Sequence, residues 1–476
     1  MHKCAQRHRV ALACRVSGAM FALVCSTVGA QPSGLQVLDL SQARQLALQN
    51  DHRYRAAISA QAAAQTERAQ GRAGLLPQIQ AGYRTSKVTG SMVQHDVSSS
   101  TRSSLDYDSL NAYVQLQQPL VNAGSYARYR RSGARADMGE AVFRVSHDEM
   151  AERVARAYFD ALLAHDGYVL QRDLVSSLQD QSRAIEGLFR QSEATRIDVQ
   201  ETRSRLTTAR ADLIEAADQW TIARRELQAL LGVSPAHLRQ LRDGFPLLPL
   251  EPSSLQAWLD MALSQNARIA MARQAVVVAN ADIDVATGQY KPTADLVASY
   301  GHANSENLSS LSQRTNTFSI GIQIRIPLFA GGYNRANVAR ARLDHTRLQQ
   351  QLRAAIEQTQ LEVTRLYTNV RAGAELIDAL RTAEQSGEIS LTSVTKGFSL
   401  GVSSNLEVLK TRERLHHTRY ALANAQRDYV LARLRLAVVA GLPQGDVFDA
   451  INEAYLGPPI VASPLKGVPL HIVQRN

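Results

Sequence analysis

The stretch FSIGIQIRIPLFAGG, residues 318–332, contains the two signals that decide the fold of this 476-residue chain. Its first part alternates apolar and polar side chains with a period of two, which predicts a β-strand with one apolar face. The apolar side chains are those of Phe318, Ile320, Ile322, Ile324 and Ile326. The Pro-Leu pair that follows ends the strand, because proline has no N–H group to donate to a sheet.

A second Pro-Leu pair lies at 119–120, and a long proline-free segment follows each of the two pairs. Residues 120–234 and 328–442 contain no proline and are equal in length. An offset of 209 residues superposes several identical residues, for example Tyr158 on Tyr367. The sequence therefore predicts an internal duplication. The predicted parts are a leader at 1–30, repeat 1 at 31–250, repeat 2 at 251–445 and a C-terminal tail at 446–476.

Within each repeat the hydrophobic period changes in the same order. Apolar residues spaced three and four apart predict a helix, and a period of two then predicts two strands. Ser-rich segments are predicted to form the loop between the two strands. The helices are predicted at 41–74 and 255–290, and the loops at 86–106 and 302–316. Two strands are not stable alone in water, so these strands need further partners.

Each proline-free segment has apolar residues at helical spacing on both sides of one break. The breaks fall near 190–197 and 397–404, where polar residues and glycine interrupt the pattern. Each segment is therefore predicted to be a helical hairpin whose longer arm reaches on the order of 100 Å, at about 1.5 Å per residue. The low aromatic content, 5%, fits long helices packed side by side through small residues.

The first thirty residues have the pattern of a secretory signal peptide. A basic head precedes a mostly apolar segment, and Val28-Gly29-Ala30 is a small-residue cleavage site. All three cysteines lie in this segment, so the mature chain is predicted to have no disulfide. Cys25 is an alternative lipidation site, although Val24 stands where that processing requires a small residue. The remaining net charge is small and spread along the chain, which predicts no nucleic-acid partner.

These features together predict a membrane channel built by several chains. Strands with one apolar and one polar face, too few per chain to close, form a transmembrane barrel when several copies contribute them. The long helices then continue the barrel as a tube. A half-buried sheet in a soluble domain is the alternative for the strand pattern alone. For the whole chain the alternative is a soluble periplasmic coiled-coil scaffold.

Over its mature length the sequence resembles the TolC-type outer-membrane factors of Gram-negative bacteria. The resemblance rests on the repeated order of helix, strand, strand and hairpin, on PLFAGG at 327–332, and on Gly401 followed by NLEVL at 405–409 and Arg412. Asp198-Val199-Gln200 with Arg203 is the equivalent in repeat 1. Within this family it more closely resembles the outer-membrane component of the type I system that exports an adenylate cyclase toxin.

The resemblance implies an α+β membrane protein that forms a trimeric channel-tunnel with two internal repeats per chain. A 12-stranded β-barrel, with four strands from each protomer, would lie in the outer membrane and continue as a 12-helix α-barrel across the periplasm. Residues 236–262 and part of the tail would form an equatorial belt. The implied partners are two further copies in a homotrimer, an inner-membrane ABC transporter, a periplasmic adaptor protein, an exported protein substrate and outer-membrane lipid.

The resemblance also implies a periplasmic gate at the hairpin turns, held by hydrogen bonds between the turns and lined by two acidic residues. Asp198 matches the acceptor on the first turn. Phe398 and Ser403 stand where the family has a tyrosine and an arginine, so the familiar latch is altered. Glu407 matches the first lining acid, whereas Lys410 replaces the second. The alternative for Glu407 and Lys410 is a solvated pair on one helix face.

Motifs of enzyme chemistry are absent from the sequence. It has no Gly-rich phosphate loop, no His-Glu-x-x-His motif and no cysteine after residue 30. We therefore expect no catalytic residue, cofactor or metal, and assign His147 and the pair His416-His417 to helix surfaces. The function predicted is the exit duct for a protein toxin, with a drug-efflux duct as the alternative, because the sequence of a duct does not name its cargo.

Clusters of arginine follow the second strand of each repeat. They are Arg128, Arg130, Arg131 and Arg135 in repeat 1, and Arg335, Arg340 and Arg342 in repeat 2. Lipid phosphates at the periplasmic rim of a barrel would attract such side chains. A plain charged helix surface is the alternative.

Overall fold

The computed structural model describes residues 37–96, 99–307 and 311–461. Close contacts divide the chain into Met1–Gly34 and Leu35–Asn476, and the second unit contains every described residue. The predicted signal peptide, including Cys25, and the tail from 462 onward lie outside the described residues. Within the described ranges, no helix is both long enough and apolar enough to cross a membrane.

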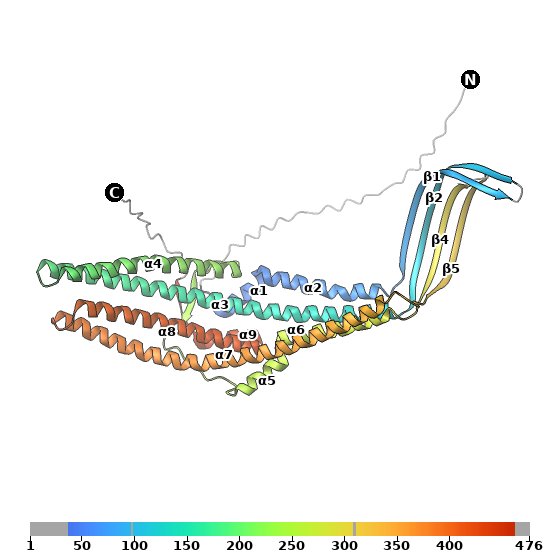
Figure 1. Ribbon diagram of the computed structural model, residues 1–476. Helices are drawn as coiled ribbons and strands as arrows, with labels where there is room; N and C mark the ends of the chain where they lie inside the picture. Colours follow the sequence, from blue (N-terminus) through green and yellow to red (C-terminus); the bar gives the residue numbers. More distant parts are fainter. Residues whose placement is uncertain (1–36, 97–98, 308–310, 462–476) are drawn as a thin grey trace, which may run out of the picture. The chain divides into compact units, whose positions relative to one another are not determined.

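The described residues form two sets of elements with the same order of a helix, two strands, a long helix and a shorter helix (Figure 1). The first set is α2 (His52–Ala73), β1 (Gln78–Asp96), β2 (Ser99–Asn122), α3 (Ala123–Arg190) and α4 (Arg196–Leu231). The second set is α6 (Ala267–Gly288), β4 (Thr293–Asn307), β5 (Leu311–Arg325), α7 (Tyr333–Ser399) and α8 (Asn405–Val439). The other elements are α1 (Leu40–Asn50), β3 (His237–Leu241), α5 (Leu255–Gln265), α9 (Gln444–Tyr455) and β6 (Leu456–Val461).

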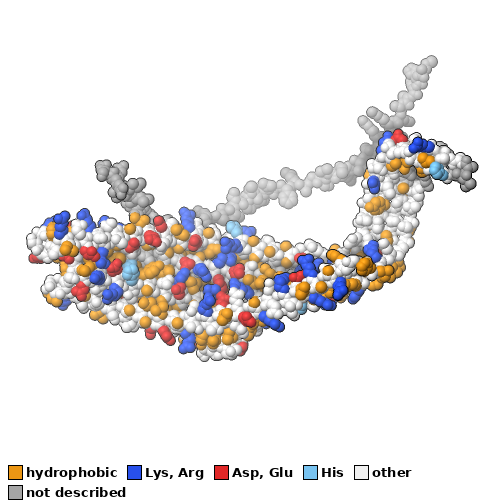
Figure 2. Space-filling view, viewed as in Figure 1, with side chains coloured by type: hydrophobic (Ala, Val, Ile, Leu, Met, Phe, Trp, Pro, Cys, Tyr) orange, Lys and Arg blue, Asp and Glu red, His pale blue; other side chains and the backbone are white. Residues whose placement is uncertain are grey.

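The four long strands form one antiparallel sheet in the order β1-β2-β4-β5, and its two faces differ in polarity. One row of directly paired residues is apolar on all four strands: Ile79, Leu116, Ala298 and Ile320. The neighbouring row, on the other face, is polar on all four: Gln80, Gln115, Ser299 and Ser319. On the side shown in Figure 2, the sheet carries fewer charged side chains than the helices do.

The predicted strand at 318–326 is confirmed up to Arg325, so Ile326 lies one residue beyond the end of β5. All five apolar side chains of this pattern are exposed, from 58% for Ile326 to 70% for Phe318. The loops predicted at 86–106 and 302–316 were wrong for most of their length, because β1 continues to Asp96 and β4 to Asn307. Serine and threonine are compatible with strands when each backbone group has a partner across the hairpin.

Each long helix packs along its length against several shorter helices. Helix α3 packs against α2, α4 and α6, and α7 packs against α6 and α8 (Figure 1). The turns between α3 and α4 and between α7 and α8 confirm the two predicted breaks. The predicted single helices at 41–74 and 255–290 are each interrupted once, at Asp51 and at Asn266.

Both interruptions have the same local cause. The Asp51 carboxylate accepts a hydrogen bond from the N–H of Arg53 at 2.8 Å, and the Asn266 amide oxygen accepts from the N–H of Arg268 at 2.9 Å. Asp and Asn side chains cap the N-terminus of a helix in this way, and they favour a new helix start over a continuous helix.

A layer of short elements surrounds the middle of the helical hairpins. Strand β3 pairs with β6, and the hydroxyl of Tyr158 donates to the carbonyl of Arg239 in β3 at 2.7 Å. The Tyr367 hydroxyl, 209 residues further along the chain, donates to the carbonyl of Ser253 at 2.5 Å. These two tyrosines thus hold the segment between α4 and α5.

Candidate gate at the hairpin tips

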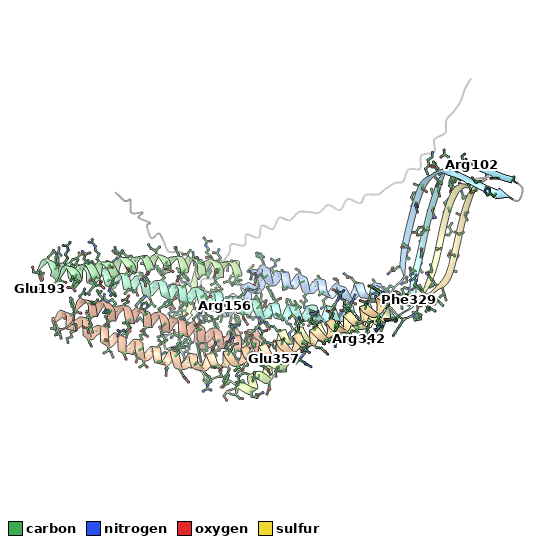
Figure 3. All side chains as sticks on the ribbon, in the orientation of Figure 1. Arg102, Arg156, Glu193, Phe329, Arg342 and Glu357 are labelled. Atoms are coloured by element: carbon green, nitrogen blue, oxygen red, sulfur yellow. The ribbon has the colours of Figure 1, made fainter. Side chains whose placement is uncertain are left out.

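The tip of the first hairpin is closed by its own hydrogen bonds. Glu193 marks this tip in Figure 3, next to Ser192, which has a positive φ of 64°. The Asp198 carboxylate accepts from the Thr195 N–H at 3.1 Å and from the Thr195 hydroxyl at 2.6 Å. This reciprocal cap begins α4. Because it engages the Asp198 side chain within the turn, Asp198 bonds to neither Phe398 nor Ser403 in the described chain.

The tip of the second hairpin is closed by backbone geometry. Gly401 has a φ of 72°, and the N–H groups of Val402 and Ser403 donate to the carbonyl of Gly397 at 2.8 and 3.2 Å. Such a left-handed glycine is the usual end of an α-helix. Phe398 lies half-buried on the last turn of α7, and the Ser404 hydroxyl caps α8 by accepting from the Glu407 N–H at 3.2 Å.

Glu407 and Lys410 lie on the first turns of α8, and both are exposed. No ion pair joins them in the part of the chain that the structure describes.

A buried polar network, which the sequence did not reveal, joins the two hairpins just behind their tips. The Asn405 amide donates to the Thr202 hydroxyl at 2.9 Å, and the Gln181 amide donates to the Asn405 carbonyl oxygen at 2.9 Å. The Thr202 hydroxyl donates to the carbonyl of Asp198 at 2.8 Å. Thr202 is 0% exposed and Asn405 3%, so water cannot replace these bonds without the hairpins separating.

Apolar and charged contacts continue this junction along the hairpins. Leu409 of α8 packs into a cluster with Val175 and Leu178 of α3 and Leu206 of α4. The Arg412 guanidinium donates to the carbonyl of Ser177 on α3 at 2.8 Å. Burial lowers the pKa of Arg412, although the nearby Asp180 opposes this shift. Of the residues that the sequence analysis singled out, Arg412 takes part in this junction; it was noted there as the counterpart of Arg203.

Four helices meet at a second group of charges, near the middle of the hairpins. The Arg435 guanidinium of α8 lies 3.4 Å from the Glu152 carboxylate of α3 and 2.9 Å from that of Glu362 on α7. Arg268 of α6 lies 3.9 Å from Glu362. Burial raises the pKa of Glu152, and Glu362 adds to the shift. These contacts tie the α3–α4 hairpin to the α7–α8 hairpin.

Asp148, one turn before Glu152, predicts a pH dependence of stability. Burial raises its pKa to about 6, despite a 2.7 Å hydrogen bond from Gln444. Because the folded pKa lies above the unfolded one, the protein loses stability as the pH rises through about 6. We expect Asp148→Asn to raise the free energy of unfolding by about 3 kcal/mol per chain at pH 7.5 and by only about 1 kcal/mol at pH 4.5, since the pKa rises from 3.8 to about 6 and each pKa unit is worth about 1.4 kcal/mol.

Thermal unfolding of the purified protein at both pH values would measure this effect. Asp173→Asn, an exposed position on the same helix, is the matched control and should leave the pH profile unchanged. Equal effects of the two substitutions, or destabilisation by Asp148→Asn at pH 7.5, would contradict the prediction.

The arginines after β2 and after β5 differ in their ion pairs. Arg130 lies 3.5 Å from Asp284 and Arg131 3.0 Å from Asp282, so these arginines join α3 to α6. Arg340 lies 3.8 Å from Asp344 on its own helix.

No group of three metal-ligating side chains is placed to hold an ion within the described ranges. His147 is half-buried, with 3.2 Å between its Nδ1 and the Tyr54 hydroxyl oxygen, and burial lowers its pKa. Burial also lowers the pKa of His416, whose ring meets that of His417 edge-on. His147 and His416 are thus packed against neighbouring side chains, whereas His417 is exposed.

Comparisons with known proteins agree with this architecture. The model of the family described as "Outer membrane efflux protein" matches residues 43–233 and 258–442. Alkaline protease secretion protein AprF of Pseudomonas aeruginosa is 33% identical, over 85% of this chain and 85% of its own. Proteases secretion protein PrtF of Dickeya chrysanthemi is 30% identical, over 90% of this chain and 92% of its own. Protein CyaE of Bordetella pertussis is 30% identical, over 54% of this chain and 55% of its own.

Solved structures extend the similarity to the fold. The Campylobacter jejuni CmeC outer membrane channel has a TM-score of 0.72 at 16% identity, with 87% of this chain and 89% of that chain covered. The two matched ranges of the family model correspond to the elements from α1 to α4 and from α5 to α8. The described helices and strands thus have the fold of an outer-membrane channel.

Proposed function

Because this chain belongs to the outer membrane efflux protein family, we propose that it forms the outer-membrane exit duct of a tripartite export system. The observation that carries this proposal is the family match at 43–233 and 258–442. Two relatives named for protease secretion match most of the chain at 30% identity or more. They favour a protein as the cargo, and hence type I secretion of a toxin or another exported protein.

The proposed duct is a homotrimer whose 12-stranded barrel receives four strands from each copy. The sheet supports this proposal, because its edge strands β1 and β5 have no further strand partner within the described chain. Its apolar face would contact lipid through Phe318, Ile320, Ile322, Ile324 and Ile326, and its polar face would line the lumen. The helices of three copies would continue the barrel as a 12-helix tube across the periplasm.

The repeated element order supports the proposed duplication, with repeat 1 at 31–250 and repeat 2 at 251–445. The β3–β6 pair and α9 support the proposal that the tail from 446 onward contributes to an equatorial belt. An inner-membrane ABC transporter and a periplasmic adaptor are the proposed partners at the hairpin tips.

The proposed gate lies at these tips. Glu407 and Lys410 would line it, and Asp198, Phe398 and Ser403 would surround it. The buried bonds between Asn405, Thr202 and Gln181 support a latch that differs from the hydrogen bonds expected of Phe398 and Ser403. Opening would require the α7–α8 hairpin to move away from α3 and α4, which breaks these bonds.

Fractionation followed by planar-bilayer conductance tests the duct. We expect heat-modifiable, detergent-requiring trimers in the outer-membrane fraction that conduct ions after reconstitution. A soluble periplasmic protein without conductance would support the coiled-coil scaffold instead. Loss of a secreted protein on deletion of the gene would identify protein export. Drug sensitivity with normal secretion would identify the efflux duct, the alternative that the family name supports.

Truncation of the tail provides a further prediction. Strand β6 ends at Val461 and pairs with β3, and Tyr455 is buried in the core. We expect trimers to survive loss of 464–476, because chain termini of this proline-containing composition generally tolerate loss. Loss of 442–476 should prevent trimer recovery. Trimers that persist without 442–476, detected by unheated gel electrophoresis, would remove the tail from the proposed belt.

A further inference from the structure

Helix α8 packs with one side of its surface and leaves the opposite side free. Asn405, Leu409 and Arg412 contact α3 and α4, and the Arg419 guanidinium binds Glu384 of α7 at 3.0 Å. With 3.6 residues per turn, the opposite side is a row of residues spaced three and four apart. We call this row the α8 stripe: Glu407, Lys410, Arg414, His417 and Ala421, all of which are exposed.

Two cations of the α8 stripe have no ion-pair partner within the described ranges. Lys410, Arg414 and His417 line a groove of about 520 Å³ together with Leu380 of α7. Glu413 also lines this groove, and its carboxylate shares the guanidinium of Arg205 on α4 with Glu201. Within the described ranges neither Lys410 nor Arg414 forms an ion pair. On the stripe itself, each copy thus has these two cations and one carboxylate, that of Glu407.

We propose that the α8 stripe is a binding track for acidic segments of an exported polypeptide as they enter the duct. The inference rests on the proposed function, in which the hairpin tips surround the entrance. Every copy would contribute the same stripe, so Lys410 and Arg414 would repeat around the entrance. A narrow, low-dielectric passage lined by one sign of charge concentrates ions of the opposite sign.

The spacing of the two cations suits an extended polypeptide. Lys410 and Arg414 are separated by about 6 Å along the helix axis, at about 1.5 Å per residue. Side chains on one side of an extended chain repeat about every 6.6 Å, twice the rise of about 3.3 Å per residue. Aspartate or glutamate at alternate positions of a passing segment can thus meet Lys410 and Arg414 in turn. The guanidinium adds bidentate carboxylate binding that an ammonium group lacks.

Block of the reconstituted channel by charged peptides tests the track. Full-length trimers in planar bilayers are exposed on the periplasmic side to polyglutamate or to polylysine of equal length. We expect polyglutamate to block at a concentration at least about tenfold lower than polylysine, and the block to weaken from 0.1 to 1 M salt as the screening length falls from about 10 to about 3 Å.

Variants then assign the block to the stripe. Lys410→Gln with Arg414→Gln should raise the polyglutamate concentration needed for half-block by about tenfold. Arg210→Gln removes an exposed cation of α4 that forms no ion pair among the described residues, and it should leave the block unchanged. Equal shifts in both variants, or equal block by the two peptides, would overturn the proposal.

A single thiol tests whether the stripe faces the lumen. Residues 31–476 contain no cysteine, so Arg414→Cys would supply the only reactive thiol. A cationic thiosulfonate reagent added on the periplasmic side should restore the block that this substitution weakens. Modification without any change in block would place the stripe outside the lumen and overturn the proposal. Wild-type trimers that do not conduct at all would instead refute the proposed duct.

Discussion

Replacing Ile322 or Ile324 with arginine should abolish recovery of assembled protein from the outer membrane. Both side chains lie on the apolar face of the sheet, and both are more than 60% exposed in the single chain. If this face meets lipid, an arginine near the middle of the bilayer costs about 2–4 kcal/mol per chain. A closed barrel contains one such arginine from every copy, so the costs add up within each assembly.

Gln323→Arg is the matched control because it introduces the same charge on the opposite face. Gln323 is paired directly with Asp295 of β4, whose carboxylate can compensate the new guanidinium. We expect normal trimers from this variant, measured by outer-membrane fractionation and unheated electrophoresis. Equal assembly of all three variants would refute the barrel assignment. Soluble, correctly folded protein from all three would favour the coiled-coil scaffold.

Breaking the network between the hairpins should open the duct. Asn405→Ala leaves the Thr202 hydroxyl without its donor and the Gln181 amide without its acceptor. A buried polar group left unpaired costs about 1–3 kcal/mol, and this cost disappears when the hairpins separate and water enters. Since about 1.4 kcal/mol changes an equilibrium tenfold, the closed state should lose at least about tenfold in relative population. The expected result is a large rise in single-channel conductance.

Thr202→Val should have the same effect, because valine keeps the shape of threonine and removes the acceptor of the Asn405 bond. The control is Thr411→Val on α8, 209 residues further along the chain, where the described residues show no such network. Unchanged conductance in Asn405→Ala and Thr202→Val, with trimers intact, would show that the network is structural. A rise in all three variants would indicate general loosening of the helices.

The strands and helices could be predicted because their signals are local. Alternation from Phe318 to Ile324 defines one strand face without reference to any other part of the chain. The interruptions at Asp51 and Asn266 could not be placed by hydrophobic periodicity, since a helix cap depends on which backbone N–H groups the side chain meets. The segment at 86–106 was predicted as a loop because it is rich in serine, yet pairing between β1 and β2 satisfies the backbone of most of it.

The position of the candidate gate could be predicted from the sequence, but its hydrogen bonds could not. The turns at 190–197 and 397–404 follow from local breaks in the helical pattern. The network behind them joins Gln181, Thr202 and Asn405, and more than 200 residues separate Asn405 from each of the other two. The periodicity of residues along one segment does not show which residue of a distant segment will be the hydrogen-bond partner. The free side of α8 likewise became visible only when the packed side was known.

The two unpaired edges of the sheet have a genetic consequence. If β5 of one copy pairs with β1 of the next, the contact is head-to-tail, and each copy both supplies and receives a strand. A copy whose β5 cannot pair still has an intact β1. It can therefore pair with one neighbour through β1, but the barrel stays open at its β5. When intact and defective copies mix at random in equal amounts, only about one trimer in eight is free of defects. Alleles that damage one edge should therefore be dominant, whereas alleles that prevent folding altogether should be recessive.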